Sequence, residues 1–359
     1  MVLTGSEARI FQVHVTRRCN LRCIHCYSSS GPEERDALPF PLLAQAIKDA
    51  AALGYNIVSF SGGEPLIRPD VTRLAAEAHS HGMAVVCVTN GLLLNARRIA
   101  ELKGSVDMLA VSLDGSPQRH NYMRAAPRAF EQMTAKLPLL REAQLPFGIV
   151  FTLTRDNLPE LGWAAQFAFE AGARLFQIHP LELTGRAADH LAGNEPTEDL
   201  PVRCWLAVQR LRQLYSGEMT IQVDLTNTSF PPLSAEECIS YAGECLAGGR
   251  KLAHFLSPLV LEPDGSVVPL RFGFPSRFAL GSLKAQNLET LAQAWIGKHA
   301  LPLAHLYRRA LANAHQLSWP VINLFDLLTA QDSTLLNSTM EICEQFHSTS
   351  TALVVLTAP

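Results

Sequence analysis

Three cysteines with short spacing are the strongest chemical signal in the sequence. Cys19, Cys23 and Cys26 follow a C-x3-C-x2-C pattern, so three thiolates come from one short loop. Three thiolates cannot complete the four-cysteine shell of an ordinary ferredoxin cluster. A 4Fe-4S cluster held here would leave one iron open for a non-protein ligand, and an open coordination position is typical of a catalytic metal site. The pattern therefore predicts a reactive metal centre.

Zinc is the alternative occupant of the same thiolates. A structural zinc site takes four ligands, so His14 or His25 would have to complete the shell. His25 lies between two proposed ligands, where its backbone could hardly let it close the same shell. Soft thiolates suit iron–sulfur clusters equally well. Taken alone, the triplet makes cluster and zinc comparable, and other segments must decide between them.

Four segments, taken in order, resemble the motifs of one family. The segment from Cys19 to Tyr27 resembles the cluster loop of the radical S-adenosylmethionine (radical SAM) superfamily, most closely the branch with SPASM or twitch C-terminal extensions. Later segments resemble the GGEP, TNG and SLDG motifs of that family: Ser61–Pro65, Thr89–Gly91 and Ser112–Gly115. The resemblance covers residues 10–185, about half the chain. The joint match is specific, whereas a lone cysteine triplet would not be.

The resemblance implies two cofactors and a set of contact residues. One 4Fe-4S cluster is expected on Cys19, Cys23 and Cys26, with S-adenosyl-L-methionine chelated to the open iron. Reductive cleavage of that molecule yields a 5′-deoxyadenosyl radical that abstracts a substrate hydrogen, so the cofactor carries the difficult chemistry. No catalytic residue beyond the cluster ligands is assigned. The expected cofactor contacts are Gly62, Gly63, Glu64, Pro65, Asn90, Ser112, Asp114, Arg124 and Thr152.

Each of these contacts has a chemical reason and a plainer alternative. The backbone at Gly62–Gly63 can approach a ligand closely, and the loop can present a carbonyl or a carboxylate to a cationic amine, which the resemblance implies is the methionyl amino group bound by Gly62–Pro65. Ser112 is expected on the ribose with Asp114 in support, against the alternative of a simple Asp-Gly turn. Arg124 can pair with the methionyl carboxylate, against the alternative of a solvated surface group. Weaker expectations fall on Tyr27, Thr152, Asn157, Gln177–Leu181 and Gly185–Arg186.

Composition and charge restrict the classes of partner. Of the 359 residues, 48% are hydrophobic and 18% are charged, which indicates a packed protein rather than a disordered one. The net charge is -3 and no basic block or aromatic-interleaved basic stripe is present, so nucleic acid is not an expected partner. No apolar run reaches the length of a membrane span, and the N-terminus lacks the apolar region of a signal peptide. A soluble cytoplasmic protein, with no membrane partner, is expected.

Strands and helices alternate through the first half. The expected strands are Phe11–Thr16, Ile57–Phe60, Ala84–Thr89, Met108–Ser112, Phe147–Leu153 and Arg174–His179. The expected helices are Pro41–Leu53, Val71–His81, Asn95–Leu102, Ala129–Ala143 and Leu158–Ala171. Such alternation predicts an α/β fold of parallel units with right-handed crossovers. About six units form a partial (β/α)6 TIM-like barrel, which the resemblance also implies, with its ligands at the carboxyl ends of the strands.

The second half is predicted to form a smaller α+β extension of the SPASM or twitch type. A polar, turn-rich stretch at residues 184–199 marks a boundary. We therefore expect a radical SAM barrel at 8–190, the extension at 200–300 and a C-terminal helical tail at 301–359. Within them we expect a helix at Val202–Leu214, a hairpin at Leu259–Pro269 around Pro-Asp-Gly, and a helix at Leu288–Trp295. From about residue 310 only weak helical patterning and an apolar end, Ala352–Thr357, are visible.

The remaining cysteines do not repeat the pattern of the triplet. They are Cys87, Cys204, Cys238, Cys245 and Cys343. Cys245 and the hairpin resemble the start of a SPASM or twitch extension, but Leu270 stands where that family usually places a cysteine. Buried free cysteines commonly act as small hydrophobic residues. We expect the extension to keep its fold without most of its auxiliary-cluster ligands.

The resemblance implies a radical SAM enzyme of the oxidoreductase or maturase type. Modification of a peptide or protein side chain is the first interpretation, and modification of a tetrapyrrole side chain is the second. A non-catalytic partner protein that keeps the fold is the alternative of another class. The expected partners are a peptide or small-molecule substrate and a flavodoxin- or ferredoxin-type reductant. A neighbouring gene for a short precursor peptide would favour the first interpretation, and neighbouring haem-pathway genes the second.

Overall fold

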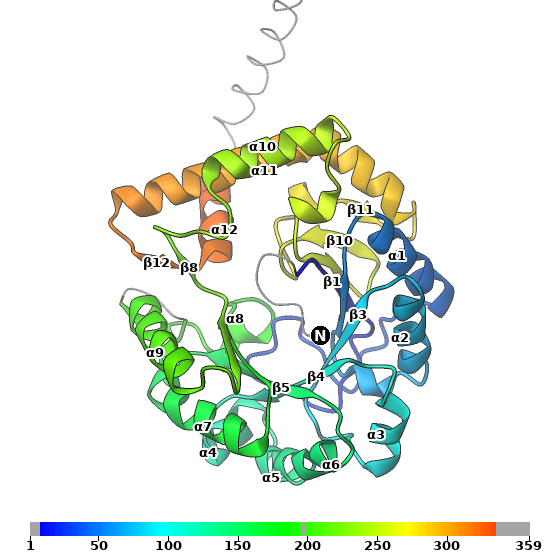
Figure 1. Cartoon of the computed structure of the whole chain (residues 1–359), viewed down its shortest axis with the longest axis vertical. Coiled ribbons are helices and arrows are strands. Elements are labelled where there is room, and N and C mark those ends of the chain that lie inside the picture. Colours follow the sequence, from blue (N-terminus) through cyan, green and yellow to red (C-terminus); the bar gives the residue numbers. More distant parts are fainter. Residues whose placement is uncertain (1–7, 196–198, 335–359) are drawn as a thin grey trace, which may run out of the picture.

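The first half of the chain is a curled parallel sheet with helices around its outer face (Figure 1). A computed structural model describes residues 8–195 and 199–334. The parallel strands are β1 (Ile10–His14), β2 (Ile57–Ser61), β3 (Ala84–Thr89), β4 (Met108–Leu113), β5 (Phe147–Leu153), β6 (Leu175–Pro180) and β7 (Thr220–Val223). The helices of this half are α1 (Phe40–Ala52), α2 (Val71–Ser80), α3 (Ala96–Leu102), α4 (Pro117–Met123), α5 (Ala129–Thr134), α6 (Leu137–Glu142), α7 (Leu161–Ala171), α8 (Arg186–His190) and α9 (Leu200–Leu214).

The predicted partial barrel is confirmed. The strands β1 to β7 pair in chain order, each parallel to the next, and each of the six predicted strands lies within two residues of its observed bounds. Side chains alternate along each strand. Apolar residues such as Phe11 and Val13 pack under the helices, and polar ones such as Gln12 and His14 take the alternate positions. All carboxyl ends of these parallel strands therefore meet at one polar mouth.

Three details of the barrel differ from the prediction. The stretch Ala129–Ala143 is two short helices rather than one, because Pro138 has no N–H to donate and begins the first turn of α6. The helix α4 and the strand β7 were not predicted. β7 is only four residues long and is recognised by its pairing with β6, which a local pattern does not reveal.

The second half continues the same sheet and adds a group of helices. The strands β9 (Leu259–Leu261), β10 (Ser266–Pro269) and β11 (Gly281–Ser282) extend the sheet beyond β1, and the predicted hairpin is confirmed as β9 and β10. The helices α10 (Ala235–Leu246), α11 (Leu288–Gln316) and α12 (Leu324–Thr334) lie between the two ends of the sheet (Figure 1). A small separate sheet joins β8 (Thr226–Asn227) to β12 (Val321–Ile322).

One helix of this half is longer than the sequence suggested, and another was not predicted. The helix predicted at Leu288–Trp295 runs on to Gln316, through Pro302 and through residues 300 and 301, where the sequence suggested a boundary. Its buried Leu and Ala side chains supply the packing that keeps the helix intact past the proline. The unpredicted helix α10 begins with a capping box between Ser234 and Glu237, a signal that is readable in the sequence. The segment Ala352–Thr357 and Cys343 lie outside the described residues.

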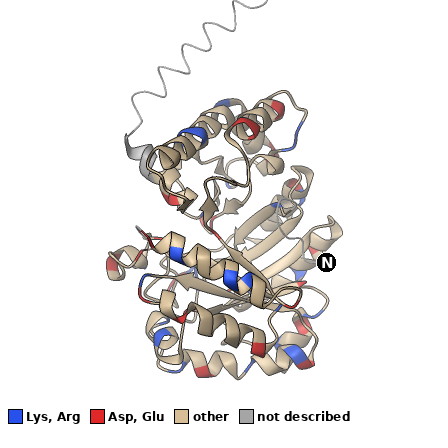
Figure 2. Ribbon diagram, turned by 60° about the vertical axis from the view of Figure 1, so that its left-hand side comes forward, with Lys and Arg blue, Asp and Glu red and all other residues tan. Residues whose placement is uncertain are grey.

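Charge is distributed over the outer elements. Figure 2 shows basic and acidic residues interspersed on the helices that surround the sheet. In residues 8–195 and 199–334, no helix combines the length and apolar character needed to cross a membrane.

One buried carboxylate, that of Asp49, joins the barrel to the extension, and its removal should lower the free energy of unfolding. Asp49 of α1 accepts hydrogen bonds from Gln45 Nε2 (2.7 Å) and from the backbone N–H of Leu288 (3.1 Å), at the start of α11. We expect Asp49→Ala to lower the free energy of unfolding by about 1–3 kcal/mol, because a buried N–H loses its acceptor. Glu289→Ala, which removes an exposed carboxylate from the same helical turn, should cost less than about 0.5 kcal/mol. Urea unfolding checks both values, and equal losses would contradict this role of Asp49.

Candidate functional site

The loop after β1 carries the three cysteines and is held from several sides. Cys19 and Cys23 are buried and Cys26 is partly exposed. The backbone N–H of Cys19 donates to Gly31 O (3.0 Å), and that of Ile24 donates to Met123 O (3.0 Å). These bonds attach the loop to its own return and to α4. The three predicted ligands thus share one ordered loop at the mouth of the barrel.

The two glycines after β2 lie against the backbone that leads into this loop. The N–H of Gly63 donates to Thr16 O (2.7 Å), and the N–H of Glu64 donates to Arg18 O (3.0 Å). A methyl group on Gly63 would overlap Arg18 O, and one on Gly62 would overlap Thr16 O. Gly62 also has a φ of +117°, which side chains other than hydrogen rarely adopt. Close backbone approach at this position therefore requires both glycines.

Glu64 joins two of the predicted motifs to each other. Its carboxylate is fully buried and accepts hydrogen bonds from Leu66 N (3.1 Å), Thr89 Oγ1 (2.9 Å) and Asn90 N (2.9 Å). Burial raises the pKa of Glu64 to about 6, although these hydrogen bonds oppose the change. The sequence suggested that this loop presents a carbonyl or a carboxylate to the cofactor amine. In the structure the Glu64 carboxylate has protein donors, because a buried carboxylate needs hydrogen bonds and the TNG segment supplies them.

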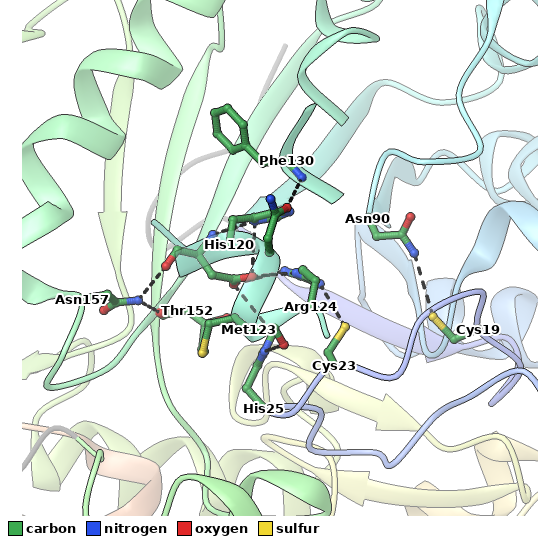
Figure 3. Close-up of polar contacts among 12 residues, drawn as sticks. Cys19, Cys23, His25, Asn90, His120, Met123, Arg124, Phe130, Thr152 and Asn157 are labelled. Atoms are coloured by element: carbon green, nitrogen blue, oxygen red, sulfur yellow. Dashed lines mark hydrogen bonds and ion pairs between the residues drawn. The ribbon is translucent and has the colours of Figure 1, made fainter. Parts of the chain in front are cut away.

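Asn90 places its amide over the first cysteine (Figure 3). Its Nδ2 donates to Asn20 Oδ1 (2.8 Å) and lies 3.9 Å from Cys19 Sγ. Its Oδ1 accepts from the N–H of Leu92 (3.0 Å). The TNG turn therefore contacts the cysteine loop directly.

A buried ion pair occupies the end of β4. Arg124 donates to both carboxylate oxygens of Asp114, at 2.6 and 3.1 Å, and its Nη1 lies 3.8 Å from Cys23 Sγ (Figure 3). Burial alone would raise the pKa of Asp114, but Arg124, followed by His25 and His120, lowers that pKa to about 2. The sequence suggested Arg124 as a partner of the methionyl carboxylate. Its guanidinium is already paired with Asp114, because burial of either charge alone would be costly.

The remaining predicted contacts divide into supports and interior positions. Asn157 is fully buried and donates to Asp114 O (3.0 Å) and Thr152 O (2.7 Å), so it connects the ends of β4 and β5. Pro65 is buried in the short turn that follows Glu64. Ser112 and Thr152 lie near the carboxyl ends of β4 and β5. Ser112 is buried and Thr152 is partly exposed. These two hydroxyls remain candidates for contact with a ligand.

The loop after β6 holds the cysteine loop in place through hydrogen bonds and a close backbone contact. The backbone N–H of Arg186 donates to Cys26 O (3.1 Å), and its side chain donates to Cys23 O (2.9 Å) and Ser30 O (2.7 Å). Gly185 lies so close to Tyr27 O that a methyl group there would overlap it. Gly185–Arg186 was expected only as a weak family element, and its structural role is to position the backbone of the three cysteines.

The two histidines considered as zinc ligands have other partners. His25 Nδ1 lies 3.1 Å from Met123 O, and His25 Nε2 lies 3.7 Å from Asp114 Oδ1. The ring of His14 stacks on Phe272 with a centroid distance of 4.9 Å, and burial lowers its pKa to about 3. No group of three or more Cys, His, Asp or Glu in the described ranges is arranged to hold a single metal ion. A 4Fe-4S cluster does not need such a group, because each thiolate binds a different iron.

The surroundings of the thiols fit an iron–sulfur cluster. Cys19 Sγ faces the N–H of Leu21 (3.4 Å) and the amide of Asn90, and Cys23 Sγ faces the Arg124 guanidinium. Such donors stabilise negative charge on cluster sulfurs. Burial raises the pKa of Cys19 to about 12, so a free thiol there stays protonated, and a bound metal would deprotonate it. The donor set, three soft sulfurs with N–H groups aimed at them, matches the predicted cofactor.

The other cysteines lie in packed regions. Cys87 is fully buried in β3, Cys204 is buried in α9, and Cys238 and Cys245 are buried in α10. Burial raises the pKa of Cys238 to about 12 and that of Cys245 to about 11. These environments suit small hydrophobic side chains.

Sequence reasoning missed several residues of the site. His25 and His120 both face Asp114, and Phe272 reaches His14 and Tyr27 from the loop after β10. His25 lies inside the cysteine motif, and His120 is the helix residue that precedes Arg124 by one turn, so both carried a weak local signal. Phe272 carried none, because its contacts come from a distant part of the chain.

Comparison with known proteins agrees with this geometry. Residues 13–168 match the family description "Radical SAM superfamily". An AdoMet-dependent heme synthase of Methanosarcina barkeri is 35% identical over 52% of this chain and 54% of its own length. The mycofactocin maturase MftC of Mycobacterium ulcerans is 30% identical over 75% of this chain and 70% of its own length. The chain thus spans about half the length of the heme synthases and more of the maturase.

Solved structures share the fold at low sequence identity. Streptococcus suis SuiB bound to S-adenosylmethionine has a TM-score of 0.62 and 16% identity, with 82% of this chain and 67% of that chain covered. The protein anSMEcpe with bound AdoMet and the Cp18Cys peptide has a TM-score of 0.58 and 16% identity, with 82% of each chain covered. Both alignments cover more of the chain than the matched barrel segment. The motifs, the partial barrel and the extended similarity to MftC lead to one assignment: the chain belongs to the radical SAM superfamily.

Proposed function

We propose that the protein is a radical SAM enzyme that modifies a peptide or protein side chain. The observation that carries this proposal is the ordered loop of Cys19, Cys23 and Cys26, with the Asn90 amide and the Arg124 guanidinium directed at its sulfurs. A 4Fe-4S cluster held by this loop would supply the electron that cleaves S-adenosylmethionine to a 5′-deoxyadenosyl radical, which abstracts a substrate hydrogen. A small reductant of the flavodoxin or ferredoxin type would be the electron source.

The residues of the chain would bind and orient these groups. Gly62 and Gly63 expose a backbone that a ligand can approach closely, and Ser112 and Thr152 offer hydroxyls near the ends of their strands. Glu64 and the Asp114–Arg124 pair would act as supporting groups for these residues. They fix the TNG turn and the end of β4 against the cysteine loop. Precise placement by such supporting groups is what a reactive intermediate requires.

The extension supports a peptide as substrate. Similarity to the maturase MftC reaches beyond the barrel, whereas similarity to the heme synthases covers only half of the chain. A mostly apolar cavity of about 300 Å³ lies between the end of β7 and the extension, lined by residues that include Leu256, Leu303 and Tyr307. This volume is at the lower end of ligand pockets and suits a side chain better than a whole macrocycle.

Modification of a tetrapyrrole side chain is the second candidate. The observation in its favour is the 34–36% identity to AdoMet-dependent heme synthases of Methanosarcina barkeri and two other organisms. Those matches cover only about half of this chain. A substrate would also contact the apolar cavity between β7 and the extension. Similarity of the barrel alone therefore does not decide between the two candidates.

Reconstitution tests the enzymatic proposal and the alternative of a non-catalytic partner. After anaerobic loading with iron and sulfide, addition of dithionite and S-adenosylmethionine should give 5′-deoxyadenosine, measured by liquid chromatography. Cys23→Ala should abolish the product, because it removes one of three ligands, while circular dichroism stays unchanged. Well-folded wild-type protein that shows neither a cluster spectrum nor 5′-deoxyadenosine would contradict the proposal.

The close approach at Gly63 gives a second prediction. Gly63→Ala would force the added methyl group against Arg18 O, at a cost of about 1–3 kcal/mol. That cost should reduce cluster loading by roughly tenfold or more, measured as iron and sulfide per chain. The matched control is Gly162→Ala in α7, where a methyl group would meet no atom within 4 Å. If both variants loaded equally well, the glycine contact would not control the cysteine loop.

Substrate choice is tested by direct competition between two probes. One is a set of synthetic short peptides translated from the open reading frames beside the gene, and the other is iron coproporphyrin III, the compound in the name of a relative from Methanosarcina barkeri. We expect a mass change in one of the peptides and none in the porphyrin. A changed porphyrin with unchanged peptides would move the assignment to the second candidate.

A further inference from the structure

A second polar cluster lies at the carboxyl ends of β6 and β7, separated from the Asp114–Arg124 pair by β5. It combines His179 at the end of β6 with Asp224, which directly follows β7. The backbone N–H of Asp224 donates to Ile178 O (3.0 Å), so the two strand ends are fixed side by side. His179 is also the register partner of Thr152 on β5. The pair therefore sits at the mouth of the barrel, at the level of a candidate cofactor contact.

The turn that follows β6 brings this cluster close to the cysteine loop. Gly185 and Arg186 contact the backbone of Tyr27 and Cys26. Glu182, earlier in the same turn, raises the pKa of Tyr27 and that of His179 through its negative charge. Glu182 therefore lies near both the cysteine loop and the histidine.

The geometry of the pair leaves one ring nitrogen available. His179 Nδ1 is paired with Asp224 Oδ2, and no hydrogen bond to Nε2 is found among the described residues. The side chain is 42% exposed, so the ring can be reached from outside the protein. A base held by a carboxylate, with its second nitrogen free, has the arrangement of a general acid–base group.

The charges around His179 favour its protonated form. Burial lowers the pKa of His179, but Asp224 and then Glu182 raise it above its usual value overall. Other elements add Arg271 after β10 and Asp326 of α12, which form an ion pair with each other and also act on Glu182. The titratable and charged groups that face this space are therefore Asp224, Glu182, Arg271, Asp326 and Tyr27.

The apolar cavity begins at the same point. Asp224 contributes to its lining, next to Val223 and Leu225, while Leu303 and Leu328 of the extension form other parts of the wall. A substrate whose apolar part filled this cavity would place an adjoining polar group at Asp224 and His179. Asp224 therefore connects the cavity, whose wall it lines, to His179, with which it is paired.

We propose that His179, positioned by Asp224, is the proton-transfer group for the substrate, an inference that rests on the proposed function. Nε2 accepts one proton from a substrate N–H, O–H or acidified C–H bond, and the bonding electron pair stays on the substrate atom. The imidazolium formed is stabilised by the Asp224 carboxylate and returns the proton to water. No electron is transferred in this step, so it needs no oxidant. His179 is the catalytic group and Asp224 is a positioning residue.

The state of His179 can be measured without turnover. In cluster-loaded protein labelled with ¹⁵N-histidine, NMR should show neutral His179 protonated at Nδ1, with a pKa above 6.5, assigned by comparison with His179→Gln. Asp224→Asn should lower that pKa by about one pH unit or more, because it removes the paired charge. A ring protonated at Nε2, or a pKa that does not change in Asp224→Asn, would overturn the proposed geometry.

The role of His179 is tested with whichever of the two probes above is consumed. His179→Gln should lower the ratio of modified probe to 5′-deoxyadenosine about 100-fold. Wild-type product formation should rise with pH as His179 loses its proton, and in Asp224→Asn that rise should move to lower pH. The matched control is His81→Gln at the end of α2, which removes a histidine paired with Glu77 far along the chain from the site and should leave the ratio unchanged.

The outcomes separate this inference from the proposed function. Active wild-type protein whose His179→Gln variant keeps the same product ratio and pH profile overturns the role of His179 alone. Wild-type protein that makes no 5′-deoxyadenosine overturns the proposed function and this inference together.

Discussion

The buried ion pair between Asp114 and Arg124 is the interaction on which the arrangement of the site depends. A fully buried carboxylate needs a charged partner and hydrogen bonds, and Arg124 supplies both through two nitrogens. The remaining guanidinium nitrogen faces Cys23, so one side chain links the end of β4 to the cysteine loop. Asn157 adds the end of β5 by donating to Asp114 O and Thr152 O. Loss of either charge would leave the other buried without a partner. The cysteine loop would then lose its contact with the end of β4.

The C-terminal extension packs against the barrel and forms part of the wall of the apolar cavity beside β7. Phe272 stacks on His14 inside the barrel, and Arg271 donates to Asp326 (2.6 Å) and to Thr329 (3.1 Å) of α12. These contacts come from the residues directly after Leu270. An ion pair and a stacked ring therefore hold the hairpin against the barrel and α12. The apolar cavity beside β7 is a product of this docking.

The barrel was predictable because its signals are local. Each long strand is an apolar run followed by a turn residue, and the parallel order follows from the alternation with helices. The strand β7 and the full length of α11 were not predictable in the same way. β7 is defined by its partner β6, and α11 continues past Pro302 because its Leu and Ala side chains are buried. The division of Ala129–Ala143 into two helices was predictable in principle, since Pro138 is visible in the sequence.

The sequence by itself determined the chemistry that the site can perform, through the spacing of Cys19, Cys23 and Cys26 and the glycines at 62 and 63. Thiolate spacing and the need for a small residue are local properties of the chain, so a short motif expresses them completely. Only the tertiary structure decided which charged groups face each other. Glu64 and Arg124, predicted as cofactor contacts, also have protein partners that the sequence did not reveal. His179 and Asp224 carry no motif, yet they meet at the mouth of the barrel. The partner of a buried charge depends on which strand ends lie side by side, and that is a property of the fold.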